Sequence, residues 1–138
     1  MITLDTPISE LNAQSKGTLM EQLGIEYLEI KDGYVKAQMP VDHRTKQPFD
    51  ILHGGASLAL AETVASLGSA LLVDLNNFDI RGASVTSNHV GAVRSGVVFG
   101  EARIIHRGKM THVWDVDIKN EQGVRASIAR VTVMVVPK

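Results

Sequence analysis

The stretch HGGASLALAETVASLGSALLV, residues 53–73, decides the fold that this sequence predicts. From Gly54 to about Val73 its apolar residues recur at helical spacing on nearly every side, so we expect one helix that is buried over most of its surface. Glycine and alanine occur along its whole length and keep the helix thin, which lets other backbone approach closely. Such a helix should be the central element of the domain.

Strand-like segments flank this helix. Before it, residues 25–30 and 34–41 alternate apolar and polar side chains, and Lys31-Asp32-Gly33 between them predicts a hairpin turn. Two short helices are expected near the N-terminus, one after Pro7 and one that Thr18 caps and Gly24 ends. After the long helix, three or four antiparallel strands are predicted over residues 80–93, 97–107, 111–119 and 124–136. The simplest fold is α+β, an antiparallel sheet wrapped around one long central helix.

A chain of 138 residues with a net charge of −1 fits one compact domain, residues 1–138. No basic stretch stands out, so neither nucleic acid nor a membrane is expected as a partner. The lack of cysteine excludes disulfides, thiolate nucleophiles and cysteine-ligated metals. The first residues lack the pattern of a signal peptide, and no stretch is apolar enough to span a membrane. We therefore expect a cytoplasmic protein.

His53, Gly54 and Gly55 stand at the start of the predicted helix, where backbone N–H groups lack intrahelical partners. Glycine lets a ligand oxygen approach these donors, and the helix dipole favours negative charge there. This is the chemistry of an oxyanion hole. The alternative is that Gly-Gly merely permits a tight turn into the helix, and the residues alone leave both interpretations open.

Glu62 is the one carboxylate within this helix, and Ser66 follows four residues later on the same face. Because burying an unpaired carboxylate is costly, Glu62 should be solvent-exposed, paired across an interface, or functional. Eight residues of helix separate it from Gly54, a rise of about 12 Å, which is too far for both to act on one carbonyl. Two antiparallel helices packed across a dimer axis would bring Glu62 of one chain beside Gly54 of the other. A sheet edge that pairs with its twin is a route to such a dimer.

The remaining sequence patterns indicate no cofactor. The five histidines show no metal-ligand spacing and no carboxylates cluster with them, so no metal is expected. The chain has no Gly-Lys-Ser/Thr phosphate loop, no dinucleotide fingerprint and no nucleophilic serine elbow.

Several short motifs together resemble one family. They are Gln47-Pro48-Phe49, residues 52–57 (LHGGAS), Ala61-Glu62, Ser66 and Asn88-His89-Val90. Over roughly residues 10–136 the chain is similar to hotdog-fold acyl-CoA thioesterases, in the branch of the 4-hydroxybenzoyl-CoA, 1,4-dihydroxy-2-naphthoyl-CoA and phenylacetate-pathway thioesterases. The resemblance implies a hotdog fold, hydrolysis of an acyl- or aryl-CoA to free acid and CoA without a further cofactor, and a homo-oligomer, commonly a dimer of dimers.

The resemblance also implies roles for individual residues. Glu62 matches the catalytic carboxylate, either as the nucleophile that attacks the thioester carbonyl or as the base that activates water. Gly55, next to Gly54, matches the backbone donor to the thioester oxygen. Gln47 and His53 match polar residues that line the carbonyl, and Ser66 matches the position that orients the attacking water. The CoA arm would be held by Gly82, His89, Val90, Gly91, Ala92, His106, Arg107, Gly108, Lys109, Met110 and Thr111.

Some of these assignments have alternatives. Arg107 and Lys109 could hold phosphates as cations, or be solvated residues at a strand end. His89 is either a CoA contact or a structural hydrogen-bonding histidine. Gly91 and Ala92 stand where relatives often carry a basic and a small polar residue, although Arg94 is close enough to supply the missing charge.

Two other activities remain open at this point. Hotdog domains that hydrate or dehydrate acyl thioesters need a histidine base paired with an acid, and His53 lies on a loop outside that usual place. A non-catalytic acyl-CoA-binding protein is the other alternative. The acyl group is not specified, because a pocket lined by side chains such as Leu58, Val64 and Val85 suits aryl, naphthoyl and medium-chain groups.

Overall fold

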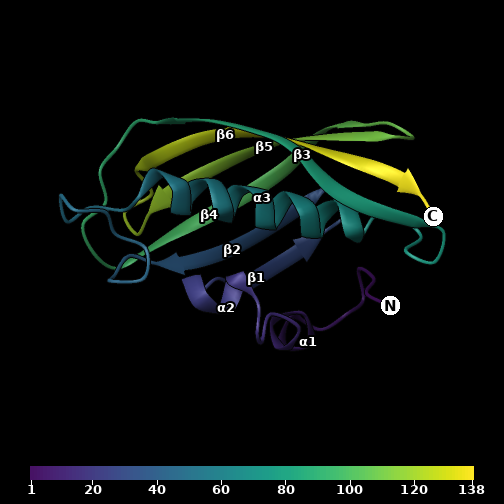
Figure 1. Ribbon diagram of the computed structural model, residues 1–138, viewed down its shortest axis with the longest axis horizontal. Coiled ribbons are helices and arrows are strands. Elements are labelled where there is room, and N and C mark those ends of the chain that lie inside the picture. Colours follow the sequence, from purple (N-terminus) through teal and green to yellow (C-terminus); the bar gives the residue numbers. More distant parts are fainter.

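A curved antiparallel sheet of six strands wraps around helix α3 (Gly54–Ala70) (Figure 1). The computed structural model describes residues 1–138. Across the sheet the strands follow the order β1-β2-β4-β5-β6-β3, and every neighbouring pair is antiparallel. This α+β arrangement is the hotdog fold that the sequence predicts. The other elements are α1 (Ile8–Ala13), α2 (Leu19–Leu23), β1 (Glu26–Lys31), β2 (Tyr34–Pro40), β3 (Phe78–His89), β4 (Val97–Arg107), β5 (Thr111–Asn120) and β6 (Arg125–Pro137).

Local sequence explains most of the turns. Gly33 closes the β1–β2 hairpin with φ at 76°, and Gly24 ends α2 with φ at 71°, both in the left-handed region that glycine adopts without strain. Thr18 occupies the N-cap position of α2, as predicted, but its side chain makes no capping hydrogen bond. Its hydroxyl donates instead to the carbonyl of Ser15 at 2.6 Å in the preceding turn.

The boundaries of two elements differ from the prediction. α3 ends at Ala70 and not at Val73, and β3 runs from Phe78 to His89 where residues 80–93 were predicted. Beyond His89 only the N–H groups of Val90 and Gly91 still bond to β6, and Val93 is buried with its carbonyl accepting the N–H of Leu52 at 2.8 Å. The segment after β3 therefore packs beside the loop that leads into α3.

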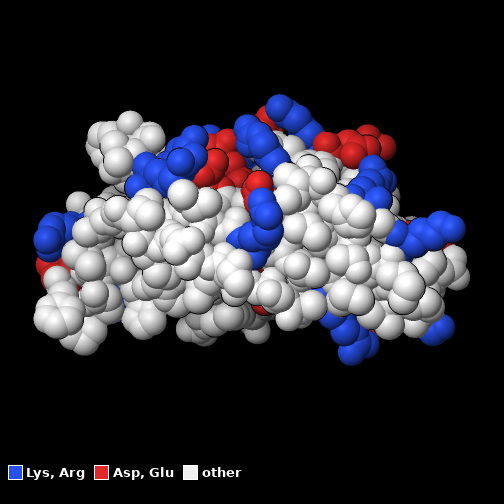
Figure 2. Space-filling model, turned by 90° about the horizontal axis from the view of Figure 1, so that it is seen from above, with Lys and Arg blue, Asp and Glu red and all other residues white.

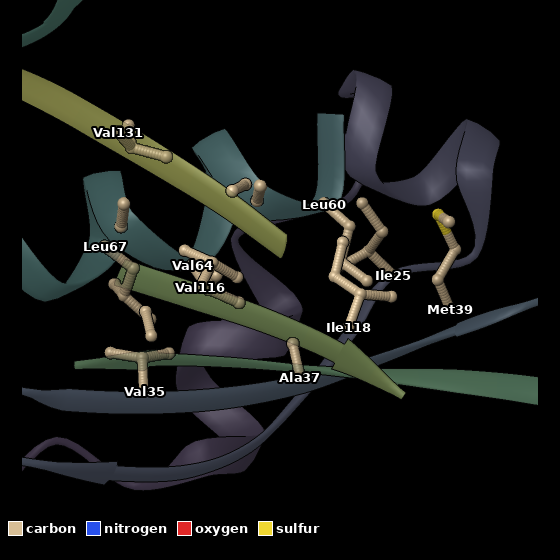
Figure 3. Close-up of a cluster of buried hydrophobic side chains, with 14 of the residues drawn as sticks. Ile25, Val35, Ala37, Met39, Leu60, Val64, Leu67, Val116, Ile118 and Val131 are labelled. Carbon is tan, nitrogen blue, oxygen red and sulfur yellow. The ribbon is translucent and has the colours of Figure 1, made fainter. Parts of the chain in front are cut away.

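The core lies between α3 and the concave face of the sheet. Figure 3 shows Leu60, Val64 and Leu67 of the helix beside Val116, Ile118 and other apolar side chains of the strands. The predicted inward face of β5 is confirmed, since His112, Trp114, Val116 and Ile118 are all buried. A Cβ at Gly68 would overlap the indole of Trp114, so the small residues of α3 do let the sheet approach its backbone. The Trp114 Nε1 donates to Ser69 Oγ at 2.9 Å.

β3 is an edge strand with unusual exposure. None of its 12 residues is buried, and residues 82–89 carry no lysine, arginine, aspartate or glutamate. In contrast, the outer face of β5 and β6 carries ion pairs such as Arg130–Asp115 at 2.9 Å and Arg125–Asp117 at 2.7 Å. Figure 2 shows charged side chains gathered toward one side of the molecule, with broad uncharged surface beside them.

Candidate active site

The start of α3 engages three of its four free backbone donors within the chain. Ala56 donates to the carbonyl of His53 at 3.0 Å, Gly55 donates to His53 Nδ1 at 2.7 Å, and His53 itself donates to the carbonyl of Thr45 at 2.8 Å. The His53 ring thus caps the helix as a neutral imidazole with its proton on Nε2. The N–H of Gly54 has no hydrogen-bond partner. Gly54 therefore offers the free donor, while the Gly55 donor that the resemblance assigns to the thioester oxygen is engaged by His53.

A cavity of about 440 Å³, here called the helix-start cavity, opens beside these donors. Three sets of predicted residues meet in it, namely Gln47, Gly54 and the segment 89–92. The side-chain carbonyl of Gln47 accepts the N–H of Phe49, which leaves the Gln47 amide nitrogen without a partner in the chain. The cavity is lined by Gln47, Ile51, Leu52, Gly54, Ser57, His89, Val90, Gly91, Ala92, Ala126 and Ser127.

Strand β6 fixes the segment 89–92 in place. The N–H groups of Val90 and Gly91 both donate to the carbonyl of Ala126, at 2.8 and 3.1 Å. His89 Nδ1 lies 2.6 Å from Ser127 Oγ. Both interpretations of His89 therefore have a structural basis, because the ring is hydrogen-bonded and also lines the cavity.

Glu62 and Ser66 share a second cavity of about 390 Å³, here called the carboxylate cavity. Both side chains lie on the same side of α3, as their spacing of four residues predicts. Glu62 is exposed and forms no ion pair, and its carboxylate lies against β3, where a Cβ at Gly82 would be 2.8 Å from Glu62 Oε1. Gly82 was predicted as a CoA contact, and in this chain it makes room for the carboxylate.

Apart from Glu62, Thr63 and Ser66, the lining of the carboxylate cavity is hydrophobic. Tyr27 is 7% exposed, its hydroxyl has no hydrogen-bond partner, and burial raises the pKa of Tyr27 to about 12. The acyl-lining residues that the sequence predicted, Leu58, Val64 and Val85, lie outside this cavity, and Val64 is fully buried under the sheet. The observed lining consists of Leu19, Met20, Tyr27, Ala59, Glu62, Thr63, Ser66, Leu67, Ala70 and Ile80.

Arg107, Gly108 and Lys109 line a third cavity of about 390 Å³, here called the cation cavity, with Leu72 and Val73 just beyond the end of α3. Arg107 lies 3.2 Å from Asp32 and is half-exposed, whereas Lys109 has no ion-pair partner. His112 forms part of the wall, and burial lowers its pKa.

The turn between β4 and β5 holds the remaining predicted CoA contacts. The N–H of Gly108 donates to the carbonyl of Thr111 at 2.9 Å, and His106 packs against Gly108. Met110 is exposed at the tip.

One chain does not bring the predicted site residues together. The helix-start cavity adjoins the first turn of α3, the carboxylate cavity follows its middle, and the cation cavity lies past its end. A helix of 17 residues spans about 25 Å, so the predicted carbonyl site and the predicted phosphate site are near opposite ends of α3.

Sequence reasoning missed several residues that line these cavities. Ser127 is the clearest case, because its partner His89 stands directly opposite it in the β3–β6 register. Only a correct pairing of two strands 38 residues apart could have revealed that contact. Tyr27 was missed because a tyrosine in an alternating strand looks like any other core residue.

The structure brings no three histidine, aspartate or glutamate side chains into a group that could hold a metal ion. None of its helices has the length and apolar character that crossing a membrane requires.

Comparisons with known proteins agree with this architecture. Residues 49–127 match the model of the Thioesterase superfamily. Proofreading thioesterase EntH from Cronobacter turicensis is 42% identical over 128 residues, which is 93% of each chain. A variant of thioesterase PA1618 from Pseudomonas aeruginosa has a crystal structure with a TM-score of 0.94 and 42% identity, covering 97% of this chain and 96% of that one. Thioesterase HI1161 from Haemophilus influenzae gives a TM-score of 0.92 and 37% identity, covering 99% and 96%. This chain is a thioester hydrolase and belongs to the Thioesterase superfamily.

Proposed function

We propose that this chain is an acyl-CoA thioesterase whose active site is shared between two copies in a homodimer. Glu62 of one copy acts on a thioester carbonyl that is held at the start of α3 in the other. One observation supports the proposal: a helix-start N–H without a partner and the pair Glu62 and Ser66 lie at two separate cavities of each chain. The free N–H of Gly54 faces the helix-start cavity, and Glu62 with Ser66 lines the carboxylate cavity.

The edge strand β3 supports the dimer. An edge strand that carries no lysine, arginine, aspartate or glutamate over residues 82–89 is a template for pairing with another strand, and a two-fold axis pairs a strand with its own copy. α3 packs against β3, so antiparallel pairing of two β3 strands carries the two helices into an antiparallel arrangement as well. That arrangement sets the middle of one α3 beside the start of the other.

The groups present are sufficient for thioester hydrolysis. Attack on the carbonyl carbon pushes negative charge onto its oxygen, where the Gly54 N–H and the helix dipole stabilise it. Collapse of the intermediate breaks the carbon–sulfur bond and releases CoA as its thiolate. If Glu62 is the nucleophile, the product is first an anhydride that water then hydrolyses, and if Glu62 is the base, it takes the proton of a water that attacks directly. Ser66, in the same cavity, can hold that water by a hydrogen bond.

The cavities also indicate how the substrate would lie. The acyl group would fill the carboxylate cavity, whose mostly apolar wall suits aryl and aliphatic acyl groups. The CoA arm would pass residues 89–92 in the helix-start cavity. In an antiparallel dimer, the end of α3 in the copy that supplies Glu62 would lie near the start of α3 in the copy that holds the carbonyl. Arg107 and Lys109 of the Glu62 copy could then bind the phosphates.

The test is release of free CoA from a panel of benzoyl-, 4-hydroxybenzoyl-, 1,4-dihydroxy-2-naphthoyl-, acetyl- and hexanoyl-CoA, followed with a thiol-reactive dye. At least one of these should be hydrolysed with a kcat/KM above about 10⁴ M⁻¹s⁻¹, the lower end for natural enzyme–substrate pairs. Turnover of the acyl-pantetheine thioesters with no preference for CoA would contradict the CoA assignment.

A single turnover in ¹⁸O-labelled water separates the two roles of Glu62. Label on the peptide containing Glu62, detected by mass spectrometry, identifies a nucleophilic carboxylate, because it requires an anhydride that water opens at the Glu62 carboxyl carbon. A general base delivers that label to the product acid.

A further inference from the structure

His89 ends β3 directly opposite Ser127 of β6. The ring Nδ1 lies 2.6 Å from Ser127 Oγ, and Ser127 is 1% exposed. A short hydrogen bond to a buried hydroxyl is sheltered from competing water and holds the plane of the ring.

The opposite edge of the His89 ring faces the start of α3. A Cβ placed on Gly54 would lie 2.6 Å from His89 Nε2 and 2.8 Å from its Cδ2, so the ring fills the space that a side chain at this position would need. Gly54 also has the one N–H of the first turn without a partner. A free backbone donor and a ring nitrogen therefore stand together in the helix-start cavity.

The contact with Ser127 determines which nitrogen of His89 carries the proton. Ser127 Oγ has no other hydrogen-bond partner in the chain. If Nδ1 carried the proton and donated it, the hydroxyl proton of Ser127 would be buried without an acceptor, which is unfavourable. When Ser127 donates to Nδ1, no buried proton is left unpaired. The ring is then neutral and its Nε2–H is a donor.

We propose that Ser127 is a positioning residue for thioester hydrolysis. It holds His89 so that Nε2–H and the N–H of Gly54 donate to the same substrate oxygen, the thioester oxygen on which charge develops. This inference rests on the proposed function. Because the two donors act on developing charge, loss of their alignment should lower kcat and leave substrate binding nearly unchanged.

The first test compares two serines whose hydroxyls are buried, with 4-hydroxybenzoyl-CoA as the probe, or benzoyl-CoA if that is the faster substrate. Ser127→Ala should lower kcat about tenfold, as expected for a misaligned oxyanion donor, with KM within about twofold of the wild type. Ser87→Ala is the matched control. The hydroxyl of Ser87 is also buried, two residues before His89 on β3, but has no hydrogen-bond partner. It should leave kcat unchanged, and an equal loss in both variants would overturn the proposal.

The second test is a double-mutant cycle with His89→Ala. If Ser127 acts through the ring, Ser127→Ala should have no further effect on kcat in the His89→Ala background. A tenfold loss in both backgrounds would show that Ser127 acts by another route and would overturn the proposal. Wild-type turnover with an unaffected Ser127→Ala variant refutes this inference alone, whereas absence of hydrolysis in the wild type refutes the proposed function.

The third test needs no variant of Ser127. Two-bond ¹H–¹⁵N spectra of the histidine-labelled wild-type protein report which ring nitrogen is protonated, with the His89 signal identified by its loss in His89→Gln. A protonated Nε2 is the expected result, and a protonated Nδ1 would overturn the proposal even if Ser127→Ala failed to fold.

Discussion

β5 and β3 belong to the same sheet and are separated only by β6, yet they expose their residues in opposite ways. Every second residue of β5 from His112 to Ile118 is buried, whereas none of the residues of β3 is. β5 has a neighbour on both sides, and β3 leaves one edge open. The inner strand contributes mainly to stability, and the edge strand carries Gly82 and His89 toward the site and is free to pair with another copy.

The comparison is tested most strongly by removing an aromatic side chain from each strand. Trp114→Ala on β5 should lower the free energy of unfolding by about 3–5 kcal/mol, because it empties fully buried space and removes the bond to Ser69. Phe78→Ala on β3 removes a half-buried ring and should lower it by less than about 2 kcal/mol. Chemical denaturation measures both, and equal losses would mean that the edge strand is as important for stability as the centre.

Replacing the carboxylate should affect activity and leave stability unchanged. Glu62→Gln should lower kcat by at least about 10²-fold, the usual effect of losing a positioned acid–base group, with no change in unfolding because the side chain is exposed. The control is Glu26→Gln, which changes an exposed glutamate on β1 and should keep full activity. A folded Glu62→Gln variant with near-native turnover would remove Glu62 from the mechanism.

Complementation tests whether the edge strand joins two chains into one site. Glu62→Gln chains and Gly55→Phe chains, each nearly inactive alone, are mixed under conditions that allow subunit exchange. Activity should rise to about a quarter of the wild type, because half of randomly paired dimers are mixed and each mixed dimer keeps one intact site. Exchange that mass spectrometry detects without any recovery of activity would exclude a shared site.

A methyl group at Gly82 should disturb the edge strand at its contact with Glu62. The added Cβ would lie 2.8 Å from the carboxylate oxygen and displace it, so Gly82→Ala should lower kcat about tenfold. In the Glu62→Gln background the same change should have little further effect, since the displaced group no longer acts. An equal loss of kcat in both backgrounds would show that Gly82→Ala acts by a route other than displacement of Glu62.

The smallest effects are expected at the far end of α3. Arg107→Ala and Lys109→Ala should each raise KM for acyl-CoA a few-fold without changing kcat, because phosphate contacts bind the ground and transition states alike. Asp32→Asn releases Arg107 from its ion pair and should not raise KM. Acyl-pantetheine substrates should not respond to these changes, and an equal loss on them would make both cations structural.

The sequence was sufficient for the features that depend on neighbouring residues. Gly33 and Gly24 end elements where glycine was expected, and the alternation around Trp114 placed the inner face of β5 correctly. The spacing of Glu62 and Ser66 put both on one face, and their shared cavity agrees with it. Each of these predictions uses only the period of a helix or strand, or the backbone preference of one residue.

Features that depend on contacts between distant segments were not predictable in this way. The ring of His53 takes the N–H of Gly55, which depends on a side-chain rotamer that no spacing specifies. Gly82 lies against Glu62 because β3 packs on α3. Arg107, at the end of β4, forms an ion pair with Asp32 in the β1–β2 turn. The path of the chain after β3 includes a hydrogen bond between Leu52 and Val93, which are 41 residues apart.

The uncharged edge of β3 also affects how the protein behaves at low concentration. Its open backbone groups accept any extended chain, and no charged residue of the segment 82–89 repels one. A copy that pairs with its twin removes this edge, but pairing depends on the square of the protein concentration. Dilution should therefore dissociate the pairs and increase the share of chains whose edge is open to a foreign strand.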